Sequence, residues 1–246
     1  MNVLTVKNIQ KSFEGNQVHK DISFELKEGE CLGLLGHSGT GKSVLLRSLV
    51  GLEKIDQGEI LFNQQRIDNL TESELYAYRT KISYSFQSGA LFDSMNVYEN
   101  LRYPLVEHTL MTEEQMNAKI DETLSIVGLK DKKHLMPSDL SGGMQKRIGL
   151  ARSIILGPEI ILYDEPTAGL DPKNIENIVG IMKKLQQSKI SSIFVTHDMP
   201  AAMEVCGRIV IIGEGKVQFE GTPDEMKASA NPFVQDFFVM EGDMRK

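Results

Sequence analysis

One glycine-rich segment constrains the fold of this 246-residue chain more than any other feature. The apolar run Cys31–Leu35 leads into Gly36–Ser43, which reads GHSGTGKS, and a helical pattern over Ser43–Leu52 follows. This is the sequence G-x-x-x-x-G-K-[S/T] in the strand, loop and helix context of a phosphate-binding loop. The segment therefore predicts an α/β fold with a nucleotide-phosphate site at the turn between this strand and this helix.

The chemistry of such a loop assigns roles to its residues. Glycines let successive backbone N–H groups point into one hollow, and the N-terminus of the helix adds its positive dipole there. We expect Lys42 to contact the β- and γ-phosphates of ATP, and the Ser43 hydroxyl to ligate Mg²⁺. The expected nucleotide contacts of this segment are Gly36, His37, Ser38, Gly39, Thr40, Gly41, Lys42, Ser43 and Val44.

A second apolar run, Ile160–Tyr163, ends in two adjacent carboxylates. A phosphate loop requires an acidic residue at the end of a buried strand to hold the metal ion, and Asp164 occupies that position. Glu165 follows where the chain leaves the sheet, in a position to deprotonate a water that attacks the γ-phosphate. We therefore expect Asp164 to be a Mg²⁺ ligand and Glu165 to be the general base of ATP hydrolysis.

Hydrophobic periodicity extends the α/β prediction along the chain. Alternating apolar residues between Leu4 and Leu35 predict an antiparallel β layer, and the apolar runs Ile160–Tyr163 and Ser192–Thr196 flank a helical stretch, Asn174–Gln187. Strand, helix and strand in this order imply a parallel sheet with right-handed crossovers. Further expected elements are hairpins over Gly58–Ile67 and Arg208–Glu220, a strand over Ile82–Phe86, an amphipathic helix over Thr112–Leu129, a helix after Gly143 and a short helical segment near the C-terminus.

Composition argues against several classes of protein. The net charge of −7 provides no general field that attracts nucleic acid, and we expect no nucleic-acid partner. Cys31 and Cys206 are too few for a disulfide framework or a metal knuckle. The first residues lack the apolar core of a signal peptide, and no apolar run approaches the roughly 18 residues that span a bilayer. We therefore expect the chain in the cytosol, reaching a membrane only through a partner.

Between the two nucleotide motifs lies Leu140-Ser141-Gly142-Gly143-Met144, which resembles the signature segment of ABC ATPases. Gln87, Ala168–Asp171 and His197 complete the motif order of that family, so the resemblance covers almost the whole chain. It implies a P-loop NTPase with a RecA-like mixed sheet, an antiparallel β layer and an inserted α-helical subdomain. It also implies one domain over residues 1–246, with a nucleotide-binding core at 1–87 and 159–246 and a helical signature subdomain at 88–158.

The resemblance assigns three further roles within one copy of the chain. Phe13 resembles the aromatic residue that stacks on adenine, although tyrosine is more common there. Gln87 resembles the glutamine that senses Mg²⁺ and the attacking water, and His197 resembles the histidine that contacts the γ-phosphate. For the other histidines, His19, His37, His108 and His134, we expect no direct catalytic role.

The signature segment implies a second copy of the chain. Ser141, Gly142 and Gly143 resemble residues whose amides face the γ-phosphate bound by the other protomer, and Asp171 resembles the residue that links the two sites. One phosphate loop and one signature per chain imply that two copies close on two ATP molecules. Met144 departs from the family pattern, in which glutamine is usual, and its effect on coupling is left open.

Two segments favour one subgroup of the family. Residues 88–97, SGALFDSMNV, and the residues Tyr103-Pro104-Leu105 and His108-Thr109 resemble the ATPases of Mla- and Mce-type lipid transport systems. The resemblance implies transmembrane permease subunits, an Mce-type lipid-binding protein, phospholipid as cargo, and a position at the cytoplasmic face of the inner membrane. Phe233, Phe237 and Phe238 are candidates for a contact between protomers.

Three alternatives compete with this interpretation. A generic ABC importer for amino acids or metal ions would share every motif except the subgroup segments. A soluble ABC ATPase of DNA repair or translation would have a long coiled-coil insertion or two nucleotide domains, whereas only 141 − 87 = 54 positions separate Gln87 from Ser141 here. A P-loop small-molecule kinase would share Gly36–Ser43 but would not need the signature.

Overall fold

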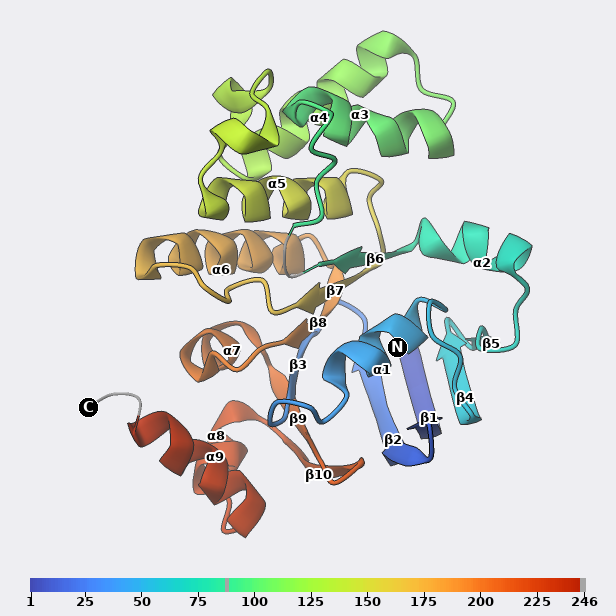
Figure 1. The fold of residues 1–246 in the computed structure, drawn as a ribbon, viewed down its shortest axis with the longest axis vertical. Helices are drawn as coiled ribbons and strands as arrows, with labels where there is room; N and C mark the ends of the chain where they lie inside the picture. The colour runs from blue at the N-terminus through green and yellow to red at the C-terminus, as the bar shows by residue number, and fades with distance from the viewer. Residues whose placement is uncertain (87–88, 244–246) are drawn as a thin grey trace.

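The computed structural model describes residues 1–86 and 89–243, and it consists of one mixed sheet flanked by helices (Figure 1). The strands are β1 (Asn2–Phe13), β2 (Asn16–Lys27), β3 (Cys31–Leu35), β4 (Gln57–Phe62), β5 (Gln65–Arg66), β6 (Ile82–Ser85), β7 (Ile160–Asp164), β8 (Ser191–Val195), β9 (Arg208–Gly213) and β10 (Lys216–Gly221). The helices are α1 (Lys42–Leu49), α2 (Glu72–Arg79), α3 (Val97–His108), α4 (Glu113–Ile126), α5 (Gly142–Ile154), α6 (Pro172–Gln187), α7 (Met199–Val205), α8 (Pro223–Ala228) and α9 (Pro232–Asp243), with short 3-10 helices at Lys130–Lys132 and Pro137–Asp139.

The sheet has ten strands in the order β5-β4-β1-β2-β10-β9-β3-β8-β7-β6. Strands β6, β7, β8, β3 and β9 run parallel to one another, whereas β1, β2, β4 and β5 form an antiparallel group. The antiparallel hairpin of β9 and β10 lies between β3 and β2 and joins the two groups. The carboxyl ends of the parallel strands therefore share one edge, where ligands bind in α/β folds.

Both faces of the parallel strands are buried, as expected for a parallel sheet. In β7, Ile160 and Leu162 face a core that contains residues of α1 and of β1, β2 and β4, whereas Ile161 and Tyr163 face a core that contains residues of α3 to α9. The same alternation in β3 places Leu32 and Leu34 on the first face. The apolar side of α1 is thus enclosed by the two strand groups, and this fixes the loop that precedes α1.

Helices α3, α4 and α5 pack against one another at the top of the view in Figure 1. The first two begin with capping boxes, Asn96 with Glu99 and Thr112 with Gln115, which satisfy amide groups that the first helical turn leaves free. The proposed helical subdomain at 88–158 includes these three helices. Within the described part of the chain, no helix combines the length and the apolar character needed to cross a bilayer.

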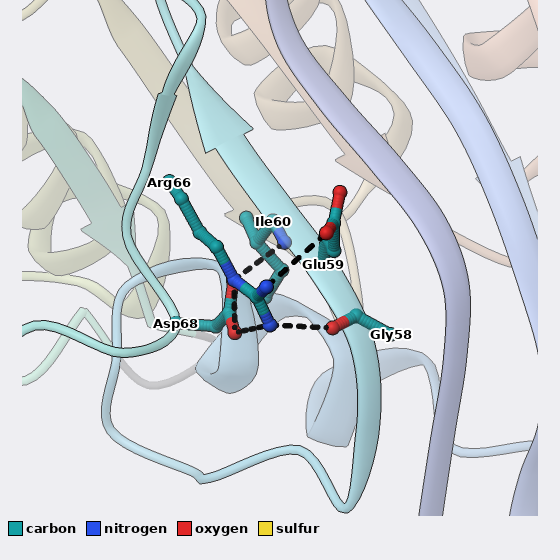
Figure 2. Close-up of polar contacts among 5 residues, drawn as sticks. All are labelled: Gly58, Glu59, Ile60, Arg66 and Asp68. Atoms are coloured by element: carbon teal, nitrogen blue, oxygen red, sulfur yellow. Dashed lines mark hydrogen bonds and ion pairs between the residues drawn. The ribbon is translucent and has the colours of Figure 1, made fainter.

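The outer end of the antiparallel group carries a polar cluster around Arg66 (Figure 2). Its guanidinium donates to Asp68, to the Glu59 carboxylate and, over 3.0 Å, to the carbonyl oxygen of Gly58, while Asp68 accepts from the Ile60 amide at 2.9 Å. Because the Arg66 side chain is 44% exposed, its ion pairs contribute little stability. The cluster mainly fixes the geometry of the short strand β5, far from the phosphate loop.

The predicted fold class is confirmed: the sheet is mixed, an antiparallel group adjoins a parallel one, and helices cover both faces. The strand predicted at Cys31–Leu35 has these bounds in the structure, and the other predicted elements are present with ends that differ by a few residues. The helix predicted over Ser43–Leu52, for example, is α1, Lys42–Leu49. Helices α2, α3 and α7 were not predicted.

Candidate functional site

The phosphate loop joins β3 to α1 and depends on glycine at several positions. Gly39 and Gly41 have φ angles of +81° and +86°, in the region that other residues rarely adopt. A Cβ atom on Gly36 would lie 2.7 Å from the carbonyl oxygen of Ile212, and one on Gly41 would lie 2.6 Å from Nε2 of His19. The glycines are therefore required both by backbone conformation and by the close packing of the loop on β2 and β9.

The side chain of Lys42 folds back over this loop. Its Nζ donates hydrogen bonds to the carbonyl oxygens of Gly36, at 2.7 Å, and His37, at 3.0 Å. Burial lowers the pKa of the Lys42 ammonium, and the nearby charges of Glu165 and Asp164 act in the opposite direction. The ammonium is thus fixed within the loop, where a phosphate could provide a counter-charge.

Ser43 and Asp164 meet as the two motifs predict. The Ser43 hydroxyl donates to Oδ1 of Asp164 at 3.0 Å, and the Tyr84 hydroxyl donates to Oδ2 at 2.5 Å. Burial and the bond to Asp164 raise the pKa of the Tyr84 hydroxyl, so it remains a donor. Tyr84 is a member of the site that sequence reasoning missed, because only the pairing of β6 with β7 brings it beside Asp164.

The donor atoms of Ser43 and Asp164 fit a magnesium ion. Mg²⁺ prefers hard oxygen ligands, and in nucleotide sites one or two carboxylates hold it together with phosphate oxygens. Across residues 1–86 and 89–243, no cluster of three or more histidine, cysteine, aspartate or glutamate side chains offers another metal site. Gln87, the third expected Mg²⁺ ligand, lies outside the described residues.

Glu165 and His197 lie together at the carboxyl edge of the sheet. Nδ1 of His197 is 2.9 Å from Oε2 of Glu165, but the two groups are not aligned as a hydrogen bond, and Oε2 is buried without a partner in the part of the chain that the structure describes. The Glu165 backbone has a φ of +51° and its amide donates to the Val195 carbonyl at 2.9 Å. Oε2 of Glu165 therefore has unused capacity to accept a hydrogen bond, and the His197 ring lies beside it.

Lys42, Ser43, Glu165 and His197 open onto one cavity of about 610 Å³, and Asp164 lies behind Ser43 without lining it. Its lining comprises Phe13, Val18, Gly36, Ser38, Gly39, Gly41, Lys42, Ser43, Val44, Glu165, Val195 and His197. Phe13 lies at the end of β1 with 39% of its surface exposed. The structure therefore brings together most of the residues that the sequence predicts for one copy of the site.

Two histidines with no expected catalytic role support the loop from outside the cavity. Nε2 of His19, a fully buried side chain, is 3.1 Å from the carbonyl oxygen of Gly41. The His37 ring stacks on Phe237 of α9, with 4.6 Å between ring centroids, and meets Phe233 edge-on at 5.6 Å. Sequence reasoning missed the His19 contact because register shifts in the pairing of β1 and β2 alter which side chains face inward.

The signature segment lies elsewhere, at the start of α5. Ser141 is the N-cap, accepting from the Met144 amide at 3.4 Å, and the two glycines form the first helical turn instead of preceding it. Ser141 and Gly142 are exposed, and none of Ser141, Gly142 and Gly143 lines the cavity. Gly143 is buried against Asn174 at the start of α6, where Asp171 is the N-cap. One copy of the chain therefore keeps its signature apart from its own phosphate loop.

Comparison with known proteins gives matches over the same motifs. A family model described as ABC transporter matches residues 19–168. The chain is 36% identical to the intermembrane phospholipid transport system ATP-binding protein MlaF of Haemophilus influenzae, over 98% of this chain and 92% of MlaF. It is 37% identical to the Arabidopsis thaliana protein TRIGALACTOSYLDIACYLGLYCEROL 3, chloroplastic, over 96% of this chain and 73% of that protein.

A third relative and a solved structure extend these matches. The methionine import ATP-binding protein MetN of Clostridioides difficile is 34% identical, over 91% of this chain and 70% of MetN. An ATP-binding cassette solved as a dimer in a post-hydrolysis state, bound to ADP and Pi, superimposes with a TM-score of 0.83 at 31% identity, covering 89% of this chain and 98% of that chain. The family match includes the phosphate loop, the signature segment and Asp164.

Proposed function

The chain belongs to the ABC transporter family, and on that premise we propose that it is the ATP-hydrolysing subunit of a transporter for phospholipid or a related lipid. The observation that carries the hydrolytic part is the convergence on one cavity of Lys42, of Ser43 with its hydrogen bond to Asp164, and of the Glu165–His197 pair. The lipid part rests on the similarity to MlaF over nearly the full length of both chains.

Each of these groups has a separate task in hydrolysis. Lys42 and the loop amides bind the β- and γ-phosphates, and Phe13 stacks on the adenine base. Ser43 and Asp164, with Gln87 assigned from the sequence, hold Mg²⁺, which when bound neutralises developing phosphate charge. Glu165 accepts the proton of the attacking water, and His197 contacts the γ-phosphate.

A second copy of the chain completes the site in this proposal. The amides of Gly142 and Gly143 lie in the first turn of α5, where no preceding carbonyl can accept from them, and the helix dipole favours an anion there. We assign these amides and Ser141 to the γ-phosphate held by the other protomer. The dimeric state of the solved cassette supports this arrangement. Two copies then close on two ATP molecules and reopen after hydrolysis.

A groove lined by residues of β6, α3 and α5 and of the segment between β6 and α3 is our candidate contact for the permease. It has a volume of about 230 Å³, and Phe92 and Tyr103 line it with 42% and 45% of their surfaces exposed. Exposed aromatic side chains in a groove are typical of protein interfaces. Docking there would place the chain at the cytoplasmic face of the inner membrane, with an Mce-type lipid-binding protein as a further component of the assembly.

An importer of amino acids is the competing proposal, because the chain is 34% identical to a methionine import subunit. This chain matches 92% of the length of MlaF but only 70% of the length of that importer subunit. The fuller match favours the lipid proposal. A role on nucleic acid finds no support in the net charge of −7.

Affinity purification from gently solubilised membranes, followed by mass spectrometry of proteins and lipids, tests the proposal. Recovery of a permease, an Mce-type protein and phospholipid is the expected result. A permease with an amino-acid-binding protein would overturn the lipid assignment and retain the ATPase. Recovery of ribosomes or nucleic acid without a permease would overturn transport altogether.

A tagged chain with Tyr103→Glu tests whether the permease binds in this groove. This substitution places a charge in the groove and leaves the nucleotide cavity unchanged, because Tyr103 is not among the residues that line it. We expect the variant to bind ATP normally but to lose the permease. Retention of the permease by this variant would place the contact on another surface.

A further inference from the structure

A buried lysine lies directly beside the aromatic residue of the nucleotide cavity. Lys11 is 8% exposed, two residues before Phe13 on β1. Its Nζ is 2.7 Å from Oε1 of Glu53 and donates to the carbonyl oxygen of Lys54 at 2.7 Å, with Oδ1 of Asp56 at 3.8 Å. Burial of a charged group is costly unless it is paired, and these contacts provide the pairing.

The same ammonium contacts the ring of Phe13. Nζ of Lys11 lies 4.7 Å from the centroid of that ring, within the range of a cation–π interaction. With the cation over one face of the ring, the opposite face is left for a base to stack on. Phe13 lies at the tip of the β1–β2 hairpin, next to a tight turn where Gly15 has a φ of +85°. Ring positions at such a tip are mobile unless something holds them.

The segment that holds Lys11 is also fixed to β1 through the backbone. The Ser12 amide donates to Oδ2 of Asp56 at 2.7 Å, and the Asp56 amide donates to the carbonyl oxygen of Gln10 at 2.9 Å. Residues 53–56 follow α1, whose N-terminus is the phosphate loop. Helix α1 and this polar cluster therefore connect the phosphate loop to the end of β1 that carries Phe13.

We propose that Lys11 is a positioning residue for the adenine of ATP: held by Glu53 and the Lys54 carbonyl, its ammonium fixes the Phe13 ring in the orientation that stacks on the base. The proposal rests on the proposed function, since it presumes that ATP binds in this cavity. It differs from a purely structural role for the ion pair because only the base, and not the phosphates, should sense the loss of Lys11.

The experiment compares Lys11→Met, which keeps the apolar stem and removes the charge, with Lys11→Arg, which keeps the charge. The probes are the Mg²⁺ complexes of a non-hydrolysable ATP analogue and of inorganic tripolyphosphate, which lacks a base. We expect Lys11→Met to weaken binding of the ATP analogue about five-fold, the size of a cation–π contact at a partly exposed ring such as that of Phe13. Tripolyphosphate binding should be unchanged, and Lys11→Arg should restore much of the loss. In steady-state hydrolysis, KM for ATP should rise while kcat is retained.

The matched control is Lys7→Met, at an exposed position of the same strand. A double-mutant cycle adds specificity: in a Phe13→Leu background, Lys11→Met should cause no further loss of ATP affinity. If Lys11→Met does not fold, Glu53→Gln weakens the anchor of Lys11 and should reproduce the base-selective loss at smaller size.

The outcomes separate the two proposals. Equal losses for the ATP analogue and tripolyphosphate, or no loss for either, would overturn the role of Lys11 while wild-type ATP hydrolysis upholds the proposed function. A wild-type chain that binds tripolyphosphate but shows no preference for ATP would overturn the assignment of Phe13 and Lys11 together. A wild-type chain that neither binds nor hydrolyses ATP would overturn the proposed function itself.

Discussion

The phosphate-loop side of the cavity and the signature segment differ in how much of their surroundings the chain itself provides. Lys42 has two carbonyl partners and Ser43 has Asp164, whereas Ser141 and Gly142 are exposed at the start of α5. The first region is organised by contacts within the chain. The second presents amide donors without a local acceptor. Under the proposed mechanism, the first region binds the nucleotide within one copy, and the second completes the site of another copy.

The largest effect should come from the region that is already organised. Glu165→Gln removes the proposed base, and we expect ATP turnover to fall about 10²- to 10⁴-fold while ATP binding persists, as measured by phosphate release and by nucleotide titration. Glu214→Gln is a matched control, because Glu214 also has a positive φ, of 52°, but is exposed at the β9–β10 turn. Near-normal turnover in Glu165→Gln would refute the assigned base.

Mixing two inactive variants tests the contrast directly. Lys42→Ala should lower turnover about 10²-fold by removing phosphate stabilisation, and Ser141→Arg should block the signature to a similar degree. If the signature acts on the other copy, a mixed dimer contains one site with an intact loop and an intact signature. The mixture should then recover several-fold more phosphate release than either variant alone. No recovery would mean that the signature serves its own chain.

A smaller effect should follow at the metal side of the cavity. Tyr84→Phe removes the hydroxyl that donates to Oδ2 of Asp164, and outer partners of metal ligands typically contribute about ten-fold in metal affinity. The Mg²⁺ concentration for half-maximal hydrolysis should rise accordingly. Tyr76→Phe, at an exposed tyrosine of α2, is the control. An unchanged Mg²⁺ requirement would limit Tyr84 to a packing role.

The smallest effect should be a pH dependence of stability from His19. Burial lowers the pKa of His19 below its usual value of 6.5, with the charge of Lys11 acting in the same direction. Below pH 6.5 the unfolded chain therefore binds a proton that the folded chain resists, so stability decreases as the pH falls. The unfolding midpoint of wild type should drop further between pH 7 and pH 5.5 than that of His19→Gln. His134→Gln, at an exposed site, should retain the full drop.

The parts of the site that the sequence predicts are those encoded locally. Gly36–Ser43 and Asp164–Glu165 each follow a short apolar strand, and the backbone geometry of a strand end is determined within a few residues. Tyr84, His19 and Lys11 were not predicted as site residues, because their positions depend on which distant strands become neighbours in the sheet. Pairing of that kind has no local sequence signal.

The missed helices have a similar explanation. Helix α3 contains Pro104, which disfavours a helix in sequence-based reasoning, yet the Asn96–Glu99 capping box and packing on α4 and α5 stabilise it. Helix α2 could have been predicted from its sequence, because Thr71 and Glu74 have the spacing of a capping box. Tertiary packing thus outweighed local propensity in α3, and an overlooked cap accounts for α2.

The position of the β9–β10 hairpin has a consequence for the order in which the protein is made. Every residue that lines the cavity precedes residue 198. The β9–β10 hairpin, which lies in the sheet between β2 and β3, occupies residues 208–221. Chains emerge from the ribosome N-terminus first. A growing chain therefore carries a complete set of cavity residues before it has the strands that hold them in one sheet, and ATP binding becomes a late event of synthesis.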